Sequence, residues 1–240
     1  MVELPSGATA WLPCIVASQN VGNGTNIGAL SHIGRDVSIG ENCRIQGCVY
    51  IADKCIIGNN VFIGAEAGRE ATSADQNTCV GYAAGGVGTM TGDDNTFIGA
   101  NAGEDCTSSE LSVAVGRQAL KNLTTGGYNT FVGSFAGCAN TTTCFNTGVG
   151  RMALCCGTGS LNTAVGNRAL VANTTASQNT AIGRCSLHGT TTGTYNTASG
   201  THSLYQNTTG EFNTSNGAHS LSENTTGNHN VGLGYYSLYR

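Results

Sequence analysis

The stretch NIGALSHIGRDVSIGENCRI, residues 26–45, decides the fold, because an aliphatic residue recurs in it at every sixth position. The same spacing runs without a slip from Ile15 to Ile63, and Gly follows the aliphatic residue in six of the nine cases. An amphipathic helix needs apolar spacings of three and four, and a half-buried strand needs strict alternation. A period of six fits neither pattern. It predicts a chain that turns a corner every six residues and points one large side chain inward from each flat side.

A second repeat follows, as in NTAVGNRALVANTTASQNTAIG at residues 162–183, where a 17-residue unit begins again at Asn179. Eleven such rungs open with Asn or Ser at intervals of 16–18 residues, from Asn60 to Asn230. Gly stands four residues after every opening, and we expect it at corners whose dihedral angles exclude other residues. The predicted corner glycines are Gly64, Gly81, Gly99, Gly116, Gly133, Gly150, Gly166, Gly183, Gly200, Gly217 and Gly234.

The two repeats belong to one construction, because Ile63 and Ala67 are members of both series and 17 is one less than three hexads. Each rung is therefore predicted to be one coil of an all-β parallel β-helix or β-roll solenoid. The chain then divides into an N-terminal cap or docking segment (1–14), a hexapeptide β-helix (15–63) of about 2.7 coils and a shaft of eleven rungs (60–240). With coils about 4.8 Å apart, the rod is on the order of 65 Å long.

The alternation of side chains along each short strand gives two faces. We expect the aliphatic column to face inward, with the Thr two positions earlier on the same side. The predicted core ladder is Ile27, Ile33, Ile39, Ile45, Ile51, Ile57, Ile63, Ile98, Val115, Val132, Val149, Val165 and Ile182. The residue between Thr and the aliphatic residue is then expected outside, as an uncharged stripe through which copies of the chain associate. This predicted stripe is Phe62, Phe97, Phe131, Ala164, Ala181 and Ala198.

Two further expectations concern the ladder of opening residues and the ends of the rod. Stacked Asn side chains at the rung openings can form an amide ladder along the axis, as in cross-β stacks. At the N-terminal end, Trp11 and Leu12 are candidates for docking into a larger particle. At the C-terminal end, Tyr235, Tyr236 and Tyr239 are candidates for a capping or contact surface, because Tyr is enriched at interfaces.

These repeats resemble known families. Residues 15–67 resemble the hexapeptide repeat of left-handed parallel β-helices, which is found in many acyltransferases. Residues 60–240, through the Val-Gly-x-x-Ala element, resemble the β-roll repeats of trimeric autotransporter adhesin heads, and still more the Asn-Thr-rich repeats of fibre proteins from tailed phages and large DNA viruses. The resemblance implies a homotrimeric fibre or spike on a virion surface, which binds other virion proteins through its N terminus and a glycan or protein on the host. A cell-surface adhesin or filament is the alternative, and a hexapeptide-type acyltransferase is the third interpretation.

Composition excludes several classes of function. A net charge of −4 with ten Lys and Arg offers no footprint for nucleic acid. No run approaches the ~18 apolar residues of a membrane span, so we expect no membrane insertion. The segment Met1–Cys14 has no basic n-region, so it does not resemble a secretory signal. We expect no catalysis, cofactor or metal, because no loop interrupts the hexads around His32 and no CxxC pair is present.

Three smaller features leave alternatives open. His202 and His219 share a position in successive rungs and are expected to stack, so a metal between them is a minor alternative. Cys138 and Cys155 also share a position, which brings their Cα atoms within range of a disulfide. The Thr column resembles that of ice-binding solenoids, but those proteins point Thr outward, whereas we place this column inside.

Overall fold

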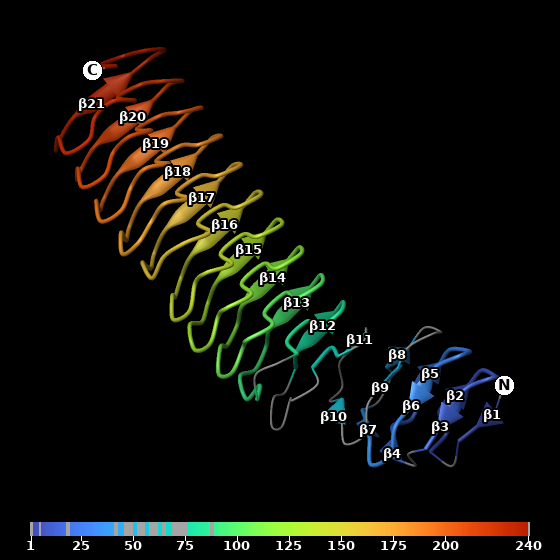
Figure 1. The fold of residues 1–240 in the computed structure, drawn as a ribbon. Helices are drawn as coiled ribbons and strands as arrows, with labels where there is room; N and C mark the ends of the chain where they lie inside the picture. Colours follow the sequence, from blue (N-terminus) through green and yellow to red (C-terminus); the bar gives the residue numbers. More distant parts are fainter. Residues whose placement is uncertain are drawn as a thin grey trace.

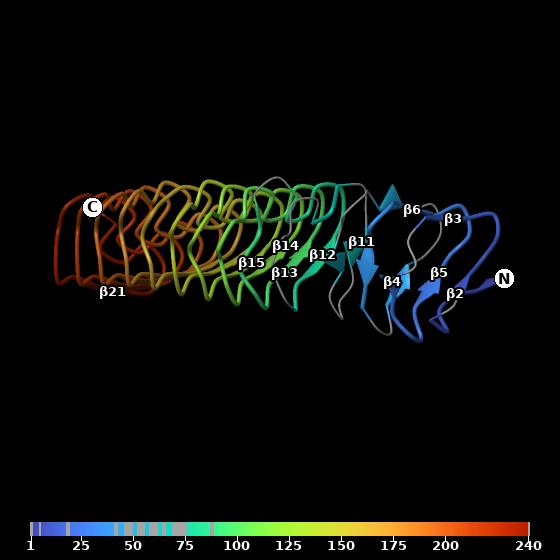
Figure 2. The same cartoon turned by 90° about the horizontal axis from the view of Figure 1, so that it is seen from below.

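The computed structural model describes residues 2–4, 6–17, 20–40, 43–45, 50–51, 56–57, 62–63, 66–68, 76–86 and 89–239. They form one elongated stack of coils whose two termini lie at opposite ends, as Figure 1 and Figure 2 show. Every regular element that we describe is a short β-strand, and these residues contain no helix that could cross a membrane. The prediction of an all-β parallel solenoid is confirmed.

The hexad region has three flat sides. Each strand pairs in parallel with the third strand after it, which gives the sheets β2-β5-β8, β3-β6-β9 and β4-β7-β10. Within the described part of the chain, only β1 runs antiparallel, against β2, where it covers the first coil. The bounds are β1 Val2–Glu3, β2 Thr9–Ala10, β3 Ile15–Val16, β4 Asn20–Val21, β5 Asn26–Ile27, β6 His32–Ile33, β7 Ser38–Ile39, β8 Arg44–Ile45, β9 Tyr50–Ile51 and β10 Ile56–Ile57.

The rungs keep one of these sides as a sheet. One strand per rung builds an eleven-stranded parallel sheet in simple chain order, from β11 to β21. Its register places each residue over the same position of the next rung, for example Val149 over Val165. The bounds are β11 Phe62–Ile63, β12 Thr78–Val80, β13 Thr96–Ile98, β14 Val113–Val115, β15 Thr130–Val132, β16 Thr147–Val149, β17 Thr163–Val165, β18 Thr180–Ile182, β19 Thr197–Ser199, β20 Thr214–Asn216 and β21 Val231–Leu233.

The predicted facing of the rung strands is wrong. In the hexad region the ladder members Ile27, Ile33, Ile39, Ile45 and Ile51 are buried. Ile15, which opens the six-residue series, is instead exposed, because Val16 rather than Ile15 pairs with Ile33. In the rungs, however, the members Ile98, Val132, Val149, Val165 and Ile182 are 37–46% exposed, and Val115 is half-buried. The predicted outward stripe lies inside instead: Phe97, Phe131, Ala164, Ala181 and Ala198 are fully buried. The side chains of Ile57, Phe62 and Ile63 lie outside the described residues, as does Gly64.

The opening Asn explains the reversal. It is buried in the shaft, for example at Asn162, where Oδ1 accepts from the backbone N–H of Asn179 in the next coil and Nδ2 donates to the carbonyl of Ala176. Alternation along the strand then sends the residue two positions later, Ala164, to the same inner side. Thr163 and Val165 consequently point outward, and a stripe that is buried within one chain cannot join two copies.

The inner column packs against a partner position six residues later in the same rung. Where the inner residue is Phe, the partner is Gly: a Cβ on Gly137 would lie 2.8 Å from the Phe131 ring, and Gly103 is equally close to Phe97. Where the inner residue is Ala, as at Ala164, the partner is a fully buried Leu, here Leu170. The Phe–Gly and Ala–Leu pairs therefore fill similar volumes, as close packing requires. The rung that opens at Asn77 differs, because it pairs the small Cys79 with Gly85.

The corners use left-handed backbone. The residue before each described rung opening has φ between 50° and 62°, as at Tyr128, and the corner glycines of the described rungs have φ of 107–142°. At Gly116 a Cβ would also lie 2.7 Å from the carbonyl of Gly133 in the next rung. Both the dihedral angle and this contact between coils exclude a side chain at that corner.

Candidate functional site

An internal ladder of Asn side chains holds the sheet in register. The backbone N–H of Asn179 donates to Oδ1 of Asn162 at 3.0 Å, and Nδ2 of Asn162 donates to the carbonyl of Ala176 at 2.9 Å. The same pair of bonds recurs in most rungs, and Ser112 Oγ takes the acceptor role toward Asn129. These bonds replace water for buried amides. The predicted amide ladder is thus present. Because the ladder lies inside the rod, the first and third residues of each strand face the solvent.

The surface outside the ladder, which we name the outer sheet face, consists of the first and third residues of strands β12–β21. Its first column is Thr in eight strands and Val in β14 and β21, and its third column is aliphatic from β12 to β18. Since the Thr column faces outward, our reason for setting ice binding aside was wrong. No charged residue stands in either column of these strands.

A second exposed column, the corner ridge, was missed in the sequence. It comprises the residues just before the rung openings and includes Leu111, Tyr128, Phe145, Leu161, Tyr195 and Phe212, each 46–54% exposed. Tyr128 stacks on Phe145 with ring centroids 5.0 Å apart, and Phe212 stacks on His229 at 5.1 Å. The signal was available, because one aliphatic or aromatic residue precedes the opening in many rungs.

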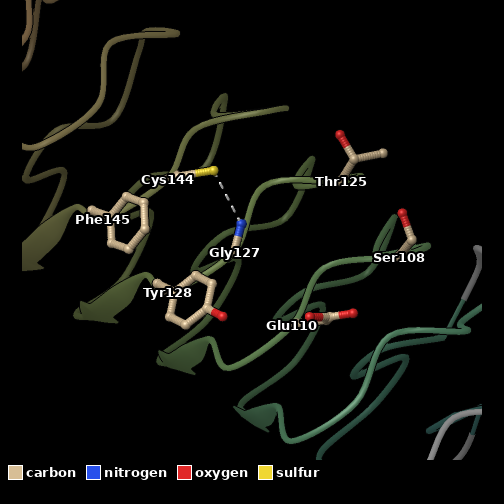
Figure 3. A pocket seen from close by; sticks show the side chains of 7 residues that line it. All are labelled: Ser108, Glu110, Thr125, Gly127, Tyr128, Cys144 and Phe145. Carbon is tan, nitrogen blue, oxygen red and sulfur yellow. Dashed lines mark hydrogen bonds between the residues drawn. The ribbon is translucent and has the colours of Figure 1, made fainter.

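A shallow cavity of about 310 Å³ opens beside this ridge, and Figure 3 shows its lining. Gly127 occupies the position that Glu110 and Cys144 occupy in the neighbouring rungs. Because Gly has no side chain, a space is left there. The backbone N–H of Gly127 donates to Sγ of Cys144 at 3.5 Å. The lining residues are Ser108, Glu110, Thr125, Gly127, Tyr128, Cys144 and Phe145. This lining combines two exposed rings with hydroxyls and one carboxylate.

Two cysteines meet between adjacent coils, as their shared position predicts. Sγ of Cys138 lies 3.4 Å from Sγ of Cys155, and both thiols are free. The hydrogen bond from Cys155 and the charge of Lys121, against the effect of burial, lower the pKa of Cys138 to about 7. The same hydrogen bond and burial raise the pKa of Cys155. Of the two thiols, Cys138 is the one whose pKa is lowered, and a lower pKa raises the fraction of the reactive thiolate.

Two histidines stack between adjacent coils near the C-terminal end. Nδ1 of His202 lies 3.5 Å from Nε2 of His219, as their shared position predicts, and the stack continues onto Tyr236. Burial, then the charges of His219 and Arg184, lower the pKa of His202. Among the described residues no three His, Cys, Asp or Glu side chains come together as metal ligands would.

The two ends place the predicted contact residues on the surface. Trp11 is 50% exposed and Leu12 is also exposed, next to the N-terminal coil. At the C-terminal end the rings of Tyr235 and Tyr236 lie 4.4 Å apart, and Tyr239 packs on Tyr236 at 4.9 Å. Trp11, Leu12, Tyr235 and Tyr236 are thus exposed, and Tyr239 is half-buried against Tyr236.

The chain is similar to one known family over a short range. The family model described as bacterial transferase hexapeptide (six repeats) matches residues 20–53. No curated protein and no solved structure matches the chain. The matched range contains His32, whose ring packs on Tyr50 with centroids 4.9 Å apart. The match therefore establishes a hexapeptide repeat over residues 20–53. It assigns no reaction to this segment.

Proposed function

We propose that the chain is the shaft of a homotrimeric structural fibre or spike, displayed on a virion surface, whose faces and ends rather than a reaction centre carry its function. The observation that supports this most is the unbroken axial register of the eleven-stranded sheet, backed by the Asn ladder. Such a quasi-one-dimensional stack is a spacer whose length follows the number of repeats. Each added rung extends the rod by about 4.8 Å.

The two ends suit the two tasks of a fibre. The exposed Trp11 and Leu12 are proposed to dock on other virion proteins, since an aromatic anchor beside an aliphatic residue is typical of binding hot spots. The Tyr group at the opposite end is proposed to contact a glycan or protein of the host surface. Tyr rings favour such contacts because they combine apolar area with a hydroxyl.

The same architecture fits a cell-surface adhesin or filament, which is the alternative proposal. A hexapeptide-type acyltransferase is the third, and it draws its support from the family match over residues 20–53. The three proposals differ in what they require: the fibre and the adhesin need self-association, whereas the transferase needs turnover of an acyl-coenzyme A.

Light scattering coupled to gel filtration, with electron microscopy of the same sample, tests the proposal. If the proposal is right, the assembled protein has three times the 24.4 kDa mass of the chain and forms rods of uniform length. A mass of 24.4 kDa at micromolar concentration would overturn the fibre proposal. Measurable transfer from acetyl-coenzyme A to an amine or alcohol would establish the transferase instead.

A further inference from the structure

Two thiols of the shaft already stand at the spacing of a disulfide. Sγ of Cys138 lies 3.4 Å from Sγ of Cys155, and the backbone N–H of Ala139 donates to the carbonyl of Cys155 at 2.8 Å. This hydrogen bond holds the two coils at the usual spacing of about 4.8 Å between neighbouring backbones. The Cα atoms of a disulfide lie about 4.4–6.8 Å apart, so closing the bond requires no movement of the coils.

The coils that carry these thiols share fewer hydrogen bonds at one corner than other coils do. At this corner Thr residues bond along the axis: the backbone N–H and the hydroxyl of Thr124 donate to the carbonyl of Thr141, at 2.8 and 3.0 Å. Thr174 makes the same two bonds to Thr191. Between Thr141 and Thr158, which both lie in the described range 89–239, neither bond forms. The row of corner bonds is therefore interrupted between these two coils.

A missing residue explains the interruption. The rung that opens at Asn146 has 16 residues, whereas the rungs on either side have 17, so its corner is shorter. Asn140, two residues after Cys138, is buried at this corner, and neither polar atom of its side chain has a hydrogen-bond partner. The equivalent Asn173 donates through Nδ2 to the carbonyl of Ala176 at 2.9 Å. This step of the rod is thus less well bonded than its neighbours, and a covalent cross-link beside the corner would restore the axial connection.

The two thiols are also the pair at which oxidation should begin. Cys138 is half-buried, and the hydrogen bond from Cys155, together with the charge of Lys121 and against the effect of burial, lowers its pKa. By contrast, Cys79 and Cys106 are fully buried, and burial raises the pKa of both. The thiolate is the form that attacks a disulfide, and thiols buried in apolar surroundings are inert. An oxidant in solution should therefore react at Cys138 rather than at the thiols of the core.

We propose that Cys138 and Cys155 are a modification site, at which a disulfide closes between adjacent coils and cross-links the step with the short corner. The oxidant is a low-molecular-weight disulfide, RSSR. The Cys138 thiolate attacks one of its sulfur atoms, which forms a mixed disulfide at Cys138 and releases RS⁻. Sγ of Cys155 gives up its proton to this RS⁻ and attacks Sγ of Cys138, which releases a second RS⁻ that takes up the proton Cys138 had lost to solvent. Two cysteine thiols are oxidised, and one RSSR is reduced to two RSH. The site lies within one chain and does not depend on the proposed self-association.

Peptide mapping of the full chain tests the site, because trypsin separates the two thiols. Cleavage after Arg151 places Cys138 in the peptide 122–151 and Cys155 in the peptide 152–168. The purified chain is equilibrated in glutathione buffers with a rising oxidised fraction, blocked with N-ethylmaleimide, digested and analysed by mass spectrometry without reductant. We expect the two peptides to become linked while the chain keeps its mass of 24.4 kDa in a non-reducing gel. Oxidation should also raise the Tm by about 6–12 °C.

Variants assign the link to its residues. The two peptides also contain Cys144 and Cys156, so the double variant Cys144→Ser with Cys156→Ser is the matched control and should keep both the link and the rise in Tm. Cys138→Ser should lose both. Comparing the oxidised with the reduced wild type needs no substitution, so the test holds even where a variant does not fold.

Three results would overturn the site: no linked peptides in the folded wild type at any glutathione ratio, a link that persists in Cys138→Ser, or a link that joins two chains. A bridge inside the peptide 152–168 in place of the link would do the same. A link that forms without raising the Tm would overturn its role as a cross-link of the weak step.

Discussion

The volume exchange between the inner column and its partner position gives the sharpest prediction. In the rung that opens at Asn162 the pair is Ala164 and Leu170, both fully buried, whereas the rung that opens at Asn129 fills the same space with Phe131 and Gly137. The Phe131 ring also lies against Gly148 of the next rung, whose counterpart beside Ala164 is Ala181. In a parent chain that carries Ala181→Gly, converting the first pair into the second by Ala164→Phe with Leu170→Gly should therefore leave the rung filled. Each single change should instead overfill the rung or empty it.

The magnitudes follow from the structure. Truncating a buried Leu costs roughly 2–5 kcal/mol, and Gly in place of Leu170 returns about 1–2 kcal/mol because φ at this position is 51°. Inserting a ring beside an intact Leu170 costs at least about 1–3 kcal/mol. Independent effects would sum to about 1–7 kcal/mol, whereas we expect the double variant to lie within about 1 kcal/mol of the Ala181→Gly parent. The coupling free energy at the middle of these ranges is then about 3 kcal/mol.

Thermal unfolding of the four chains measures this cycle, since 1 kcal/mol shifts the Tm of a chain of this size by about 2–4 °C. Both single variants should unfold several degrees below the Ala181→Gly parent, and the double variant should recover most of the loss. The geometry that the double variant should reproduce is that of Phe131, whose ring lies 2.8 Å from the point where a Cβ on Gly137 would stand. A double variant no more stable than the weaker single variant would refute the constant-volume account of the core.

Three further predictions concern the ladder and the titrating side chains. Asn162→Ala should lower the free energy of unfolding by about 1–3 kcal/mol in denaturant titration, because the buried N–H of Asn179 loses its acceptor. The control Asn167→Ala lies in the same rung but outside the ladder, and it should change this free energy by less than about 0.5 kcal/mol. Alkylation of Cys138 by iodoacetamide, followed by mass spectrometry, should reach half its maximal rate near pH 7. Cys155→Ala, which removes the hydrogen-bond donor, should move that point to higher pH, and an unchanged profile would contradict the role of the shared hydrogen bond. The pKa of His202 is lowered in the folded chain, so its contribution to stability is complete above the unfolded pKa of about 6.5 and is lost as the pH falls through the folded value. The Tm should therefore drop between pH 7 and pH 5, and less so in His202→Asn, whereas equal drops would contradict this assignment.

The sequence by itself determined the architecture, because the repeat length fixes the stacking of coils whichever face of each strand is buried. The strict six-residue spacing around Ile33 and the 17-residue spacing of the opening asparagines each require coils stacked in register. From that stacking the Asn ladder, the meeting of Cys138 with Cys155 and that of His202 with His219 follow directly. None of these contacts depends on which face of the strand is buried.

Only the tertiary structure decided which face of each strand is inside. A three-residue strand such as Thr163–Val165 alternates equally well in either sense, and a one-residue change of phase exchanges its two faces. The choice was made by contacts across the coil: the buried amide of Asn162, the left-handed corner before it and the Leu or Gly that faces Ala164 or Phe131. The pairing of Phe with Gly was visible in the sequence, but only the closed coil shows that those two positions share one space.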